Sequence, residues 1–141
     1  MARLSKDFNS REFRCPCCGK VFVDERLVQA LQELRDLVKV PIFITSAYRC
    51  PNHNKKVGGA NFSYHTKGMA ADIHIKYMLV KQMYKAALKV EAFRNGGIGL
   101  YPDNKFIHVD VRPGHARWAK VRGDNGKMKQ VSIEKIYKEE D

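Results

Sequence analysis

The sequence predicts an α+β fold, in which a small central antiparallel sheet is flanked by two main helices. Two segments carry apolar residues at helical spacing, and four short segments are rich in β-branched and aromatic residues. The 141 residues, with 44% hydrophobic and 10% aromatic residues, suit one domain with its own core. We find no internal repeat or linker, and expect one domain over residues 1–141, with its core at about 13–119 and a basic tail at 120–141.

The two predicted helices differ in the clarity of their ends. The first spans residues 24–39, has leucines on one face, can be capped by Asp24 and is followed by Pro41. The second spans residues 77–90, where apolar residues recur at the same spacing. We expect the apolar face of the first helix to pack on the sheet, and that of the second to join the core.

The four predicted strands are short. They span residues 40–46, 69–75, 98–101 and 106–111. Residues 102–105 are typical of a hairpin turn, so we expect the last two strands to be antiparallel neighbours. Residues 52–63 are predicted as loop with one helical turn near 53–57, and residues 130–137 as an edge strand or a short helix.

The net charge of +11 indicates attraction to polyanions such as nucleic acid, anionic lipid or phosphate-bearing wall polymers. Lysine and arginine are scattered along the chain without a known nucleic-acid-binding motif, so we do not expect specific nucleic-acid binding. The chain lacks both an apolar run of about 18 residues for a membrane span and the apolar segment of a signal peptide. We therefore expect a protein that is made in the cytoplasm, and as a separate expectation we predict a monomer.

Two histidines and an aspartate can converge on one metal ion. Asp72 lies on a predicted strand, and His65 precedes it with Gly68 between them, which allows a loop imidazole and a strand carboxylate to meet. His108 on a neighbouring strand can supply the third ligand. Two imidazoles and a carboxylate with an open fourth position are typical of a hydrolytic zinc centre rather than a structural one.

The cysteines allow a second metal site. Cys15 and Cys18 form a C-x-x-C pair, while Cys50 and His53 form a C-x-x-H pair. Together they match the Cys3His ligand set of a structural zinc. The alternatives are a disulfide between Cys50 and an N-terminal cysteine, which synthesis in the cytoplasm disfavours, or free buried thiols.

A longer pattern runs from about residue 24 to residue 119. Its pieces are Thr45-Ser46-Ala47-Tyr48-Arg49, His53-Asn54, Val57-Gly58-Gly59, Ser63-x-His65-x-x-Gly68-x-Ala70-x-Asp72, Gly97-Ile98-Gly99-x-Tyr101-Pro102, Phe106-Ile107-His108-Val109-Asp110 and Trp118. In order and spacing it resembles the zinc D-alanyl-D-alanine carboxypeptidases of the M15 peptidase family, particularly their small phage and bacterial branch. Lysostaphin-type endopeptidases and the hedgehog signalling domain belong to the same superfamily.

The resemblance implies one catalytic zinc held by His65, Asp72 and His108, with a metal-activated water attacking the scissile carbonyl. It also implies that Arg49 faces the active site and binds the terminal carboxylate of the substrate or the oxyanion. Ser63 is expected to support the ligand loop and to lie beside the substrate. The implied substrate is a peptidoglycan stem peptide, cut near D-alanine.

One part of the family pattern is missing. Many relatives have a glutamate or histidine shortly before the last zinc histidine, where it takes a proton from water, and here that position carries no such residue. Strand alternation places Asp110 on the face of His108, where it can act as the base or can orient a ligand. Asp103 is the second candidate for the base, and His74 is a weaker candidate for contact with metal or substrate.

We therefore predict a zinc metallopeptidase of peptidoglycan, either a D-Ala-D-Ala carboxypeptidase or an endolysin-type L,D- or D,D-peptidase. A phage-type lysin of this kind would act at the cell wall or in the periplasm, where the positive charge suits anionic wall polymers. Two other classes stay open. One is a zinc-containing binding module without catalysis, and the other is a basic nucleic-acid-binding zinc protein.

Overall fold

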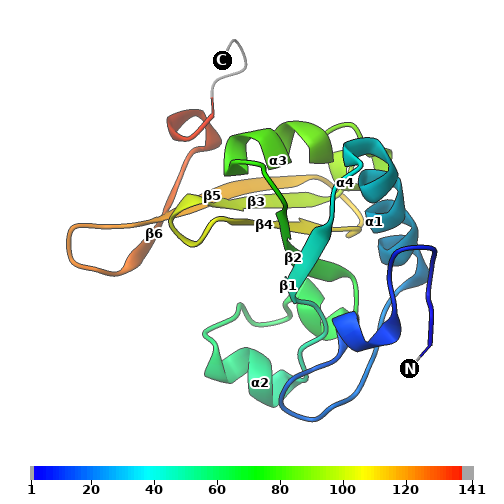
Figure 1. The fold of residues 1–141 in the computed structure, drawn as a ribbon. Helices are drawn as coiled ribbons and strands as arrows, with labels where there is room; N and C mark the ends of the chain where they lie inside the picture. Colours follow the sequence, from blue (N-terminus) through cyan, green and yellow to red (C-terminus); the bar gives the residue numbers. More distant parts are fainter. Residues whose placement is uncertain (1, 138–141) are drawn as a thin grey trace.

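A computed structural model describes residues 2–137 and has the predicted α+β architecture (Figure 1). Six strands form one sheet in the order β1-β2-β4-β3-β5-β6. The helices α1 (Glu25–Val38), α3 (Val80–Ala87) and α4 (Glu91–Arg94) pack together, and α3 and α4 contact the sheet. Helix α2 (Pro51–Lys56) lies apart from them, at the lower end in Figure 1. Within residues 2–137, no helix has the length and hydropathy to cross a bilayer.

The strands confirm the four predicted segments, include one at the edge strand allowed for residues 130–137, and add β5. They are β1 (Ile42–Ser46), β2 (Ala70–Ile75), β3 (Gly97–Tyr101), β4 (Phe106–Asp110), β5 (Ala116–Arg122) and β6 (Met128–Val131). All neighbouring pairs are antiparallel except β3 and β5, which run parallel. The parallel pair arises because residues 111–115 carry the chain from the end of β4 across the start of β3 to its free edge.

The first predicted helix is confirmed, and the second is shorter and divided. Asp24 caps α1 by accepting a hydrogen bond from the backbone N–H of Arg26, and the apolar face of α1 is buried. Tyr77 has a φ of 68°, which is incompatible with a right-handed helix, so α3 begins only at Val80. Val90 is extended and separates α3 from α4.

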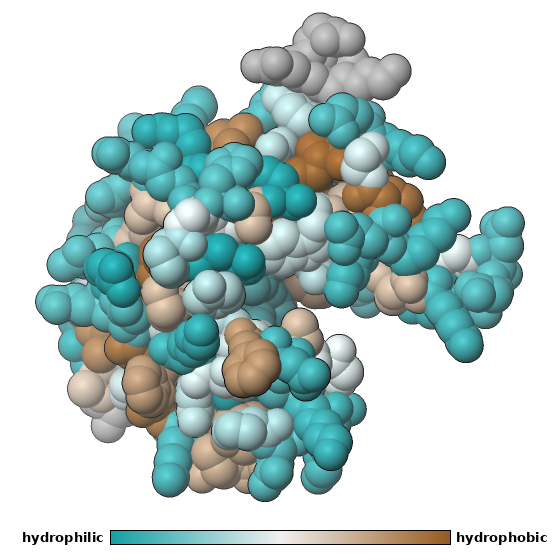
Figure 2. Space-filling view, turned by 180° about the vertical axis from the view of Figure 1, so that it is seen from behind, coloured by the Kyte–Doolittle hydropathy of each residue, from teal (hydrophilic) through white to brown (hydrophobic). Residues whose placement is uncertain are grey.

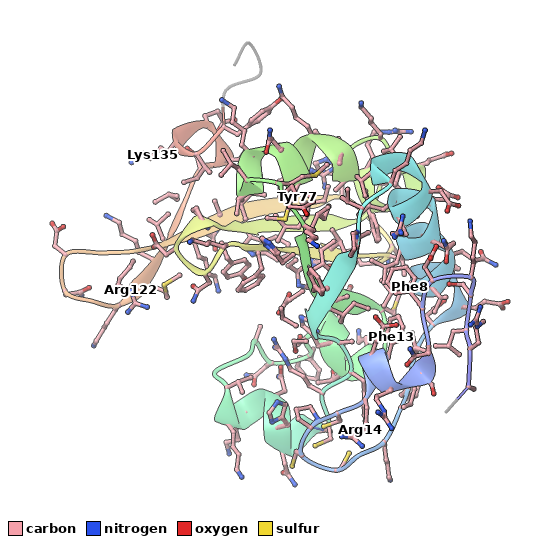
Figure 3. All side chains as sticks on the ribbon, viewed as in Figure 1. Phe8, Phe13, Arg14, Tyr77, Arg122 and Lys135 are labelled. Atoms are coloured by element: carbon pink, nitrogen blue, oxygen red, sulfur yellow. The ribbon has the colours of Figure 1, made fainter. Side chains whose placement is uncertain are left out.

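The N-terminal lead-in, predicted to be irregular, contributes to the core. A 3-10 helix spans Ser10–Phe13, and Asn9 caps it. Phe8 and Phe13 are buried with their rings edge to face, 6.3 Å apart between centroids, beside α1 (Figure 3). The packed part of the chain therefore begins before residue 13.

The C-terminal segment, predicted as a basic tail, continues the sheet. The β5–β6 hairpin projects from the body of the molecule in Figure 1. Both alternatives predicted for residues 130–137 occur in succession, because β6 is followed by a 3-10 helix over Ile133–Lys135. Residues 102–105 form the predicted turn between β3 and β4, as a 3-10 helix over Pro102–Asn104 that is followed by the C-cap residue Lys105.

We predict that Gly99→Ala destabilises the protein. Gly99 lies opposite Trp118 in the β3–β5 register, and an added Cβ would overlap the indole ring. Forcing a methyl group into this contact should lower the free energy of unfolding by about 1–3 kcal/mol. Urea unfolding followed by the fluorescence of the single tryptophan measures both the stability and the displaced ring.

Gly123→Ala is the matched control for this substitution. Its added Cβ would make only ordinary van der Waals contacts, so its stability should stay near that of the wild type. If the two variants unfold at the same urea concentration, the close packing of Trp118 on β3 is not a constraint on the fold.

Candidate active site

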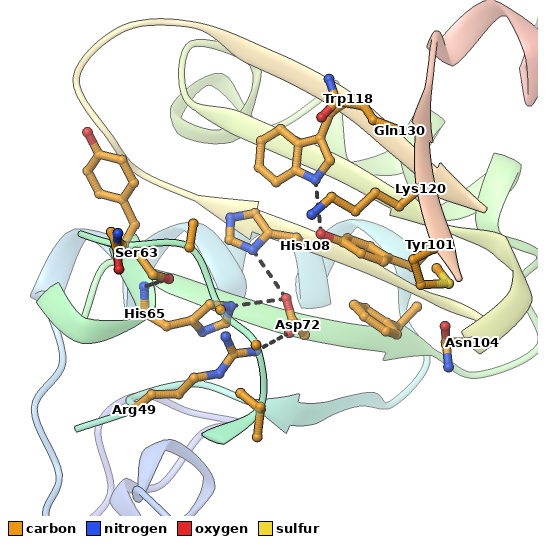
Figure 4. A pocket seen from close by; sticks show the side chains of 18 of the residues that line it. Arg49, Ser63, His65, Asp72, Tyr101, Asn104, His108, Trp118, Lys120 and Gln130 are labelled. Carbon is orange, nitrogen blue, oxygen red and sulfur yellow. Dashed lines mark hydrogen bonds and ion pairs between the residues drawn. The ribbon is translucent and has the colours of Figure 1, made fainter. Parts of the chain in front are cut away.

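A cavity of about 740 Å³ separates the loop that follows α2 from the open side of the sheet. Residues 57–65 line one side, and side chains of β3, β4 and the β5–β6 hairpin line the other. In the space-filling view from behind, the mostly hydrophilic surface is hollowed between the projecting hairpin and the lower part of the molecule (Figure 2). Asp72, His65 and His108 also line this cavity, as the close-up in Figure 4 shows.

His65, Asp72 and His108 meet at one point, as predicted. His65 Nε2 and His108 Nδ1 each lie 3.2 Å from the same atom, Asp72 Oδ1 (Figure 4). The β2–β4 register places Asp72 beside His108, and the 3-10 helix η2 (Tyr64–Lys67) brings in His65. All three side chains are buried, and their possible ligand atoms lie within 4.8 Å of one another.

The hydrogen bonds behind the two imidazoles fix their tautomers. His65 Nδ1 lies 2.7 Å from the carbonyl oxygen of Ala47, which only accepts hydrogen bonds, so Nδ1 carries the proton. His108 Nε2 lies 2.7 Å from Asp110 Oδ2, so in this ring Nε2 carries the proton. In its neutral form each ring therefore directs a lone pair toward Asp72.

Two lone pairs and a carboxylate oxygen at one buried point fit a cation. Burial alone would raise the pKa of Asp72, but hydrogen bonds with His108 and His65 hold it well below its usual range. Burial lowers the pKa of His108, yet hydrogen bonds with Asp110 and Asp72 raise it above its ordinary value. The site thus favours positive charge, and its nitrogen and oxygen donors suit zinc.

Asp110 lies behind His108, away from the cavity. Its Oδ1 accepts hydrogen bonds from the backbone N–H groups of Gly97 and Arg112, at 2.8 and 3.1 Å, while Oδ2 accepts from His108. The Arg112 guanidinium binds both oxygens, with Nη2 2.7 Å from Oδ2. With 0% of the residue exposed and both oxygens occupied, this carboxylate is arranged to orient His108 rather than to reach a water in the cavity.

Arg49 lines the cavity beside Asp72, as predicted. Its Nη2 lies 3.1 Å from Asp72 Oδ2, on the side of the carboxylate that the histidines leave free. Its Nε donates to Ser46 Oγ and its Nη1 to Asn54 Oδ1. The guanidinium is therefore held by three side chains of the protein itself.

Ser63 caps the turn that carries His65. Its Oγ accepts a hydrogen bond from the backbone N–H of His65 at 3.2 Å, and Gly68 ends the same turn in the left-handed conformation. Ser63 also lines the cavity, so it lies where a substrate could contact it.

The weaker candidates lie outside the cluster. Asp103 accepts a hydrogen bond from the backbone of Arg122, and His74 contacts the carbonyl oxygen of Lys105 at 2.8 Å. Neither is among the residues that line the cavity, and His115 is exposed. Among the cavity-lining residues in the described part of the chain, Asp72 is the only carboxylate.

The cysteines form a second cluster that is separate from this cavity. Possible ligand atoms of Cys15, Cys18 and Cys50 lie within 4.8 Å of one another, as the sequence suggested. The ring of His53 is not part of this group, and the backbone N–H of His53 donates to Cys50 Sγ at 3.5 Å. The predicted Cys3His set is therefore only partly assembled.

Two residues of the site were not assigned a role from the sequence. The Tyr101 hydroxyl accepts a hydrogen bond from Trp118 Nε1 at 3.0 Å, which leaves its own O–H proton available at the cavity (Figure 4). Burial raises the pKa of Tyr101, so the hydroxyl stays protonated. Arg112 lies between the rings of Tyr64 and Trp118. Strand alternation after His108 and Asp110 is the signal that would have pointed to Arg112.

Comparisons with known proteins agree with the geometry. A family model described as Peptidase M15 matches residues 6–110. The chain is 37% identical over 98 residues to the peptidoglycan L,D-endopeptidase MepK of Escherichia coli K12, an alignment covering 64% of this chain and 52% of the relative. It is 45% identical over 56 residues, covering 40% of this chain and 28% of the relative, to a probable peptidoglycan L,D-endopeptidase MepK of Haemophilus influenzae.

The chain spans about half the length of the E. coli relative, at 52%. The family match covers well over half of the chain and includes every residue of the His65, Asp72 and His108 cluster. On these grounds the chain belongs to the M15 peptidase family.

Proposed function

We propose that this protein is a zinc-dependent peptidoglycan peptidase that cleaves an internal bond between an L- and a D-configured centre. The observation that carries the proposal is the convergence of His65 Nε2, His108 Nδ1 and an Asp72 oxygen at one buried point of the cavity. The names of the two relatives, both L,D-endopeptidases of peptidoglycan, support the substrate class.

Zinc bound by His65, Asp72 and His108 would supply Lewis-acid activation of a water molecule and of the scissile carbonyl. Ala47 and Asp110 hold the two histidines in the tautomers that such binding requires. The available proton of the Tyr101 hydroxyl can be donated to the carbonyl oxygen of the substrate as negative charge develops there.

Arg49 supports an endopeptidase more than a carboxypeptidase. A carboxypeptidase must bind the terminal carboxylate of its substrate, and a free guanidinium is well suited to that task. The Arg49 guanidinium instead donates to Ser46, Asn54 and Asp72. We therefore assign Arg49 chiefly to holding Asp72, with its remaining donor capacity directed at the cavity.

The cavity is open and bears positive charge. Lys120 lines the wall formed by β5, and the chain as a whole carries a net charge of +11. Both features suit stem peptides, which carry carboxylates, and anionic wall polymers. Synthesis in the cytoplasm and action on the wall as a phage-type lysin stay predictions of the sequence.

We predict that His65→Ala and His108→Ala abolish both zinc binding at the cavity and peptidoglycan cleavage. Activity should fall by more than about 100-fold, because even residues that only orient a zinc ligand contribute about 10–100-fold. Mass spectrometry of digested muropeptides, with cross-linked dimers and uncross-linked pentapeptides supplied separately, measures the products. The exposed His115→Ala should retain both zinc and activity.

The same digest tests the alternatives. Release of D-alanine from pentapeptides without cleavage of any internal bond would show a carboxypeptidase. A wild-type protein that binds zinc and releases no product from either substrate would be a binding module, and the proposed activity would be wrong.

We predict that Asp110→Asn weakens zinc binding by about 10–100-fold, and that activity near the wild-type level returns at saturating zinc. The reason is that the carboxylate orients His108 without reaching the cavity. A zinc titration of kcat measures this rescue. A loss of about 10²-fold or more that persists at saturating zinc would instead assign Asp110 as the general base. Asp103→Asn is the matched control and should be neutral.

We predict that Tyr101→Phe lowers kcat by about 10²-fold without changing zinc affinity, because it removes one hydrogen-bond donor to the developing oxyanion. Steady-state kinetics on a muropeptide dimer and a zinc titration measure the two quantities. Tyr64→Phe is the control, since the Tyr64 ring rather than its hydroxyl packs on Arg112. Equal kcat values for the two variants would remove Tyr101 from the reaction.

A further inference from the structure

The cysteine cluster joins two segments that are far apart in sequence. Cys15 and Cys18 come from the N-terminal segment, and Cys50 comes from the loop directly before α2. Figure 3 shows sulfur atoms gathered between the loop after Arg14 and this helix. Cys15 is buried and Cys18 is exposed, so a metal can reach the cluster from solvent. All four cysteines are free thiols.

Cys15 and Cys18 lie in a tight hairpin. The backbone N–H of Cys15 donates to Lys20 O at 2.8 Å, and that of Gly19 donates to Cys15 O at 2.8 Å. Gly19 has a φ of 75°, which glycine adopts without strain, and it lets the chain reverse directly after Cys18. The hairpin therefore holds the sulfur atoms of Cys15 and Cys18 close together, within 4.8 Å of each other.

Backbone N–H groups prepare the sulfur atoms for metal binding. The N–H of Cys50 donates to Cys15 Sγ at 3.4 Å, and the N–H of His53 donates to Cys50 Sγ at 3.5 Å. Burial raises the pKa of Cys15, but hydrogen bonds from the backbone of Cys50, Cys18 and Cys17 lower it to about 7. These donors stabilise the thiolate, which is the form that binds metals.

Cys17, like His53, lies outside this group of three, and its exposed thiol is our candidate for a fourth ligand. Its side chain interacts with that of Cys50, and the side chain of Cys18 interacts with those of Cys15 and Cys50. Zinc bound to thiolates at about 2.3 Å would bring the sulfur atoms about 3.8 Å apart. The present spacing, within 4.8 Å for Cys15, Cys18 and Cys50, needs only a small contraction.

The hairpin has little else to hold it. Residues 16–20 are exposed, so this segment lacks the apolar contacts that fix a loop in a fold. Its two ends nevertheless touch the active-site loops. Phe13 O accepts a hydrogen bond from the backbone of Tyr48, and Phe22 stacks on the Tyr48 ring at 5.8 Å and packs against Gly68.

We propose that Cys15, Cys17, Cys18 and Cys50 bind a structural zinc ion that fastens the N-terminal hairpin to the loop carrying Arg49. Cys50 directly follows Arg49, and the backbone N–H of Arg49 donates to His65 O at 3.2 Å. The ion therefore braces both loops that supply the candidate active site. The site itself is independent of the proposed peptidase function, and only its effect on activity rests on that function.

The test is the zinc content of the purified, reduced full-length chain. We expect two zinc ions per chain in the wild type, and one in Cys18→Ser, in Cys50→Ser and in His65→Ala. Replacing zinc by cobalt(II) should give a sulfur-to-cobalt charge-transfer band that His65→Ala retains and Cys18→Ser loses. The band in the wild type needs no variant, so misfolding of a cysteine variant does not affect that result.

Several outcomes would overturn the proposal. They are a single zinc that is lost with His65→Ala, a wild-type cobalt spectrum without a thiolate band, or a disulfide found by mass spectrometry of the protein purified without reductant. If the peptidase proposal fails instead, muropeptides stay intact while the thiolate band persists.

The fourth ligand is tested separately. Cys17→Ser should lower the zinc affinity of this cluster at least about 10-fold, whereas His53→Ala should leave it unchanged. The reverse result would overturn the assignment of Cys17.

Discussion

The carboxylate of Asp72 is the interaction on which the site depends. One of its oxygens faces both His65 and His108, and the other binds Arg49, so one side chain connects β2, β4, the η2 turn and the loop after β1. A buried charge is tolerated only where it is paired. The four elements must therefore stay in register for the carboxylate to remain compensated, and the geometry of the cluster is tied to the stability of the fold.

A second set of side chains supports His108 from behind. Asp110 holds His108, Arg112 holds Asp110, and the Arg112 guanidinium lies between the rings of Tyr64 and Trp118. Trp118 also packs on the His108 ring, with centroids 4.9 Å apart. Since β5 supplies Trp118, the parallel strand that the sequence did not predict completes the support of a histidine on β4.

Local patterns predicted α1, the strands β1 to β4 and the candidate metal cluster, because these depend on periodicity and on spacing within one sheet. The division of the second helix was missed, since the left-handed Tyr77 and the extended Val90 carry no glycine or proline signal. Strand β5 was missed because its basic residues read as a solvated tail. Spacing also suggested His53 as a metal ligand, but Cys50 caps α2, so its sulfur accepts a hydrogen bond from the backbone N–H of His53.

The family model covers one part of the cavity lining and leaves out the part that the β5–β6 hairpin supplies. The three residues of the metal cluster fall within the segment matched by the family model, residues 6–110, whereas Lys120, Met128 and Gln130 of the opposite wall lie beyond it. Within this wall only β6 is an edge of the sheet, so it can lengthen, shorten or change its charges while β5 keeps Trp118 against His108. The outer wall of the cavity can therefore vary within this architecture while the cluster of His65, Asp72 and His108 stays unchanged.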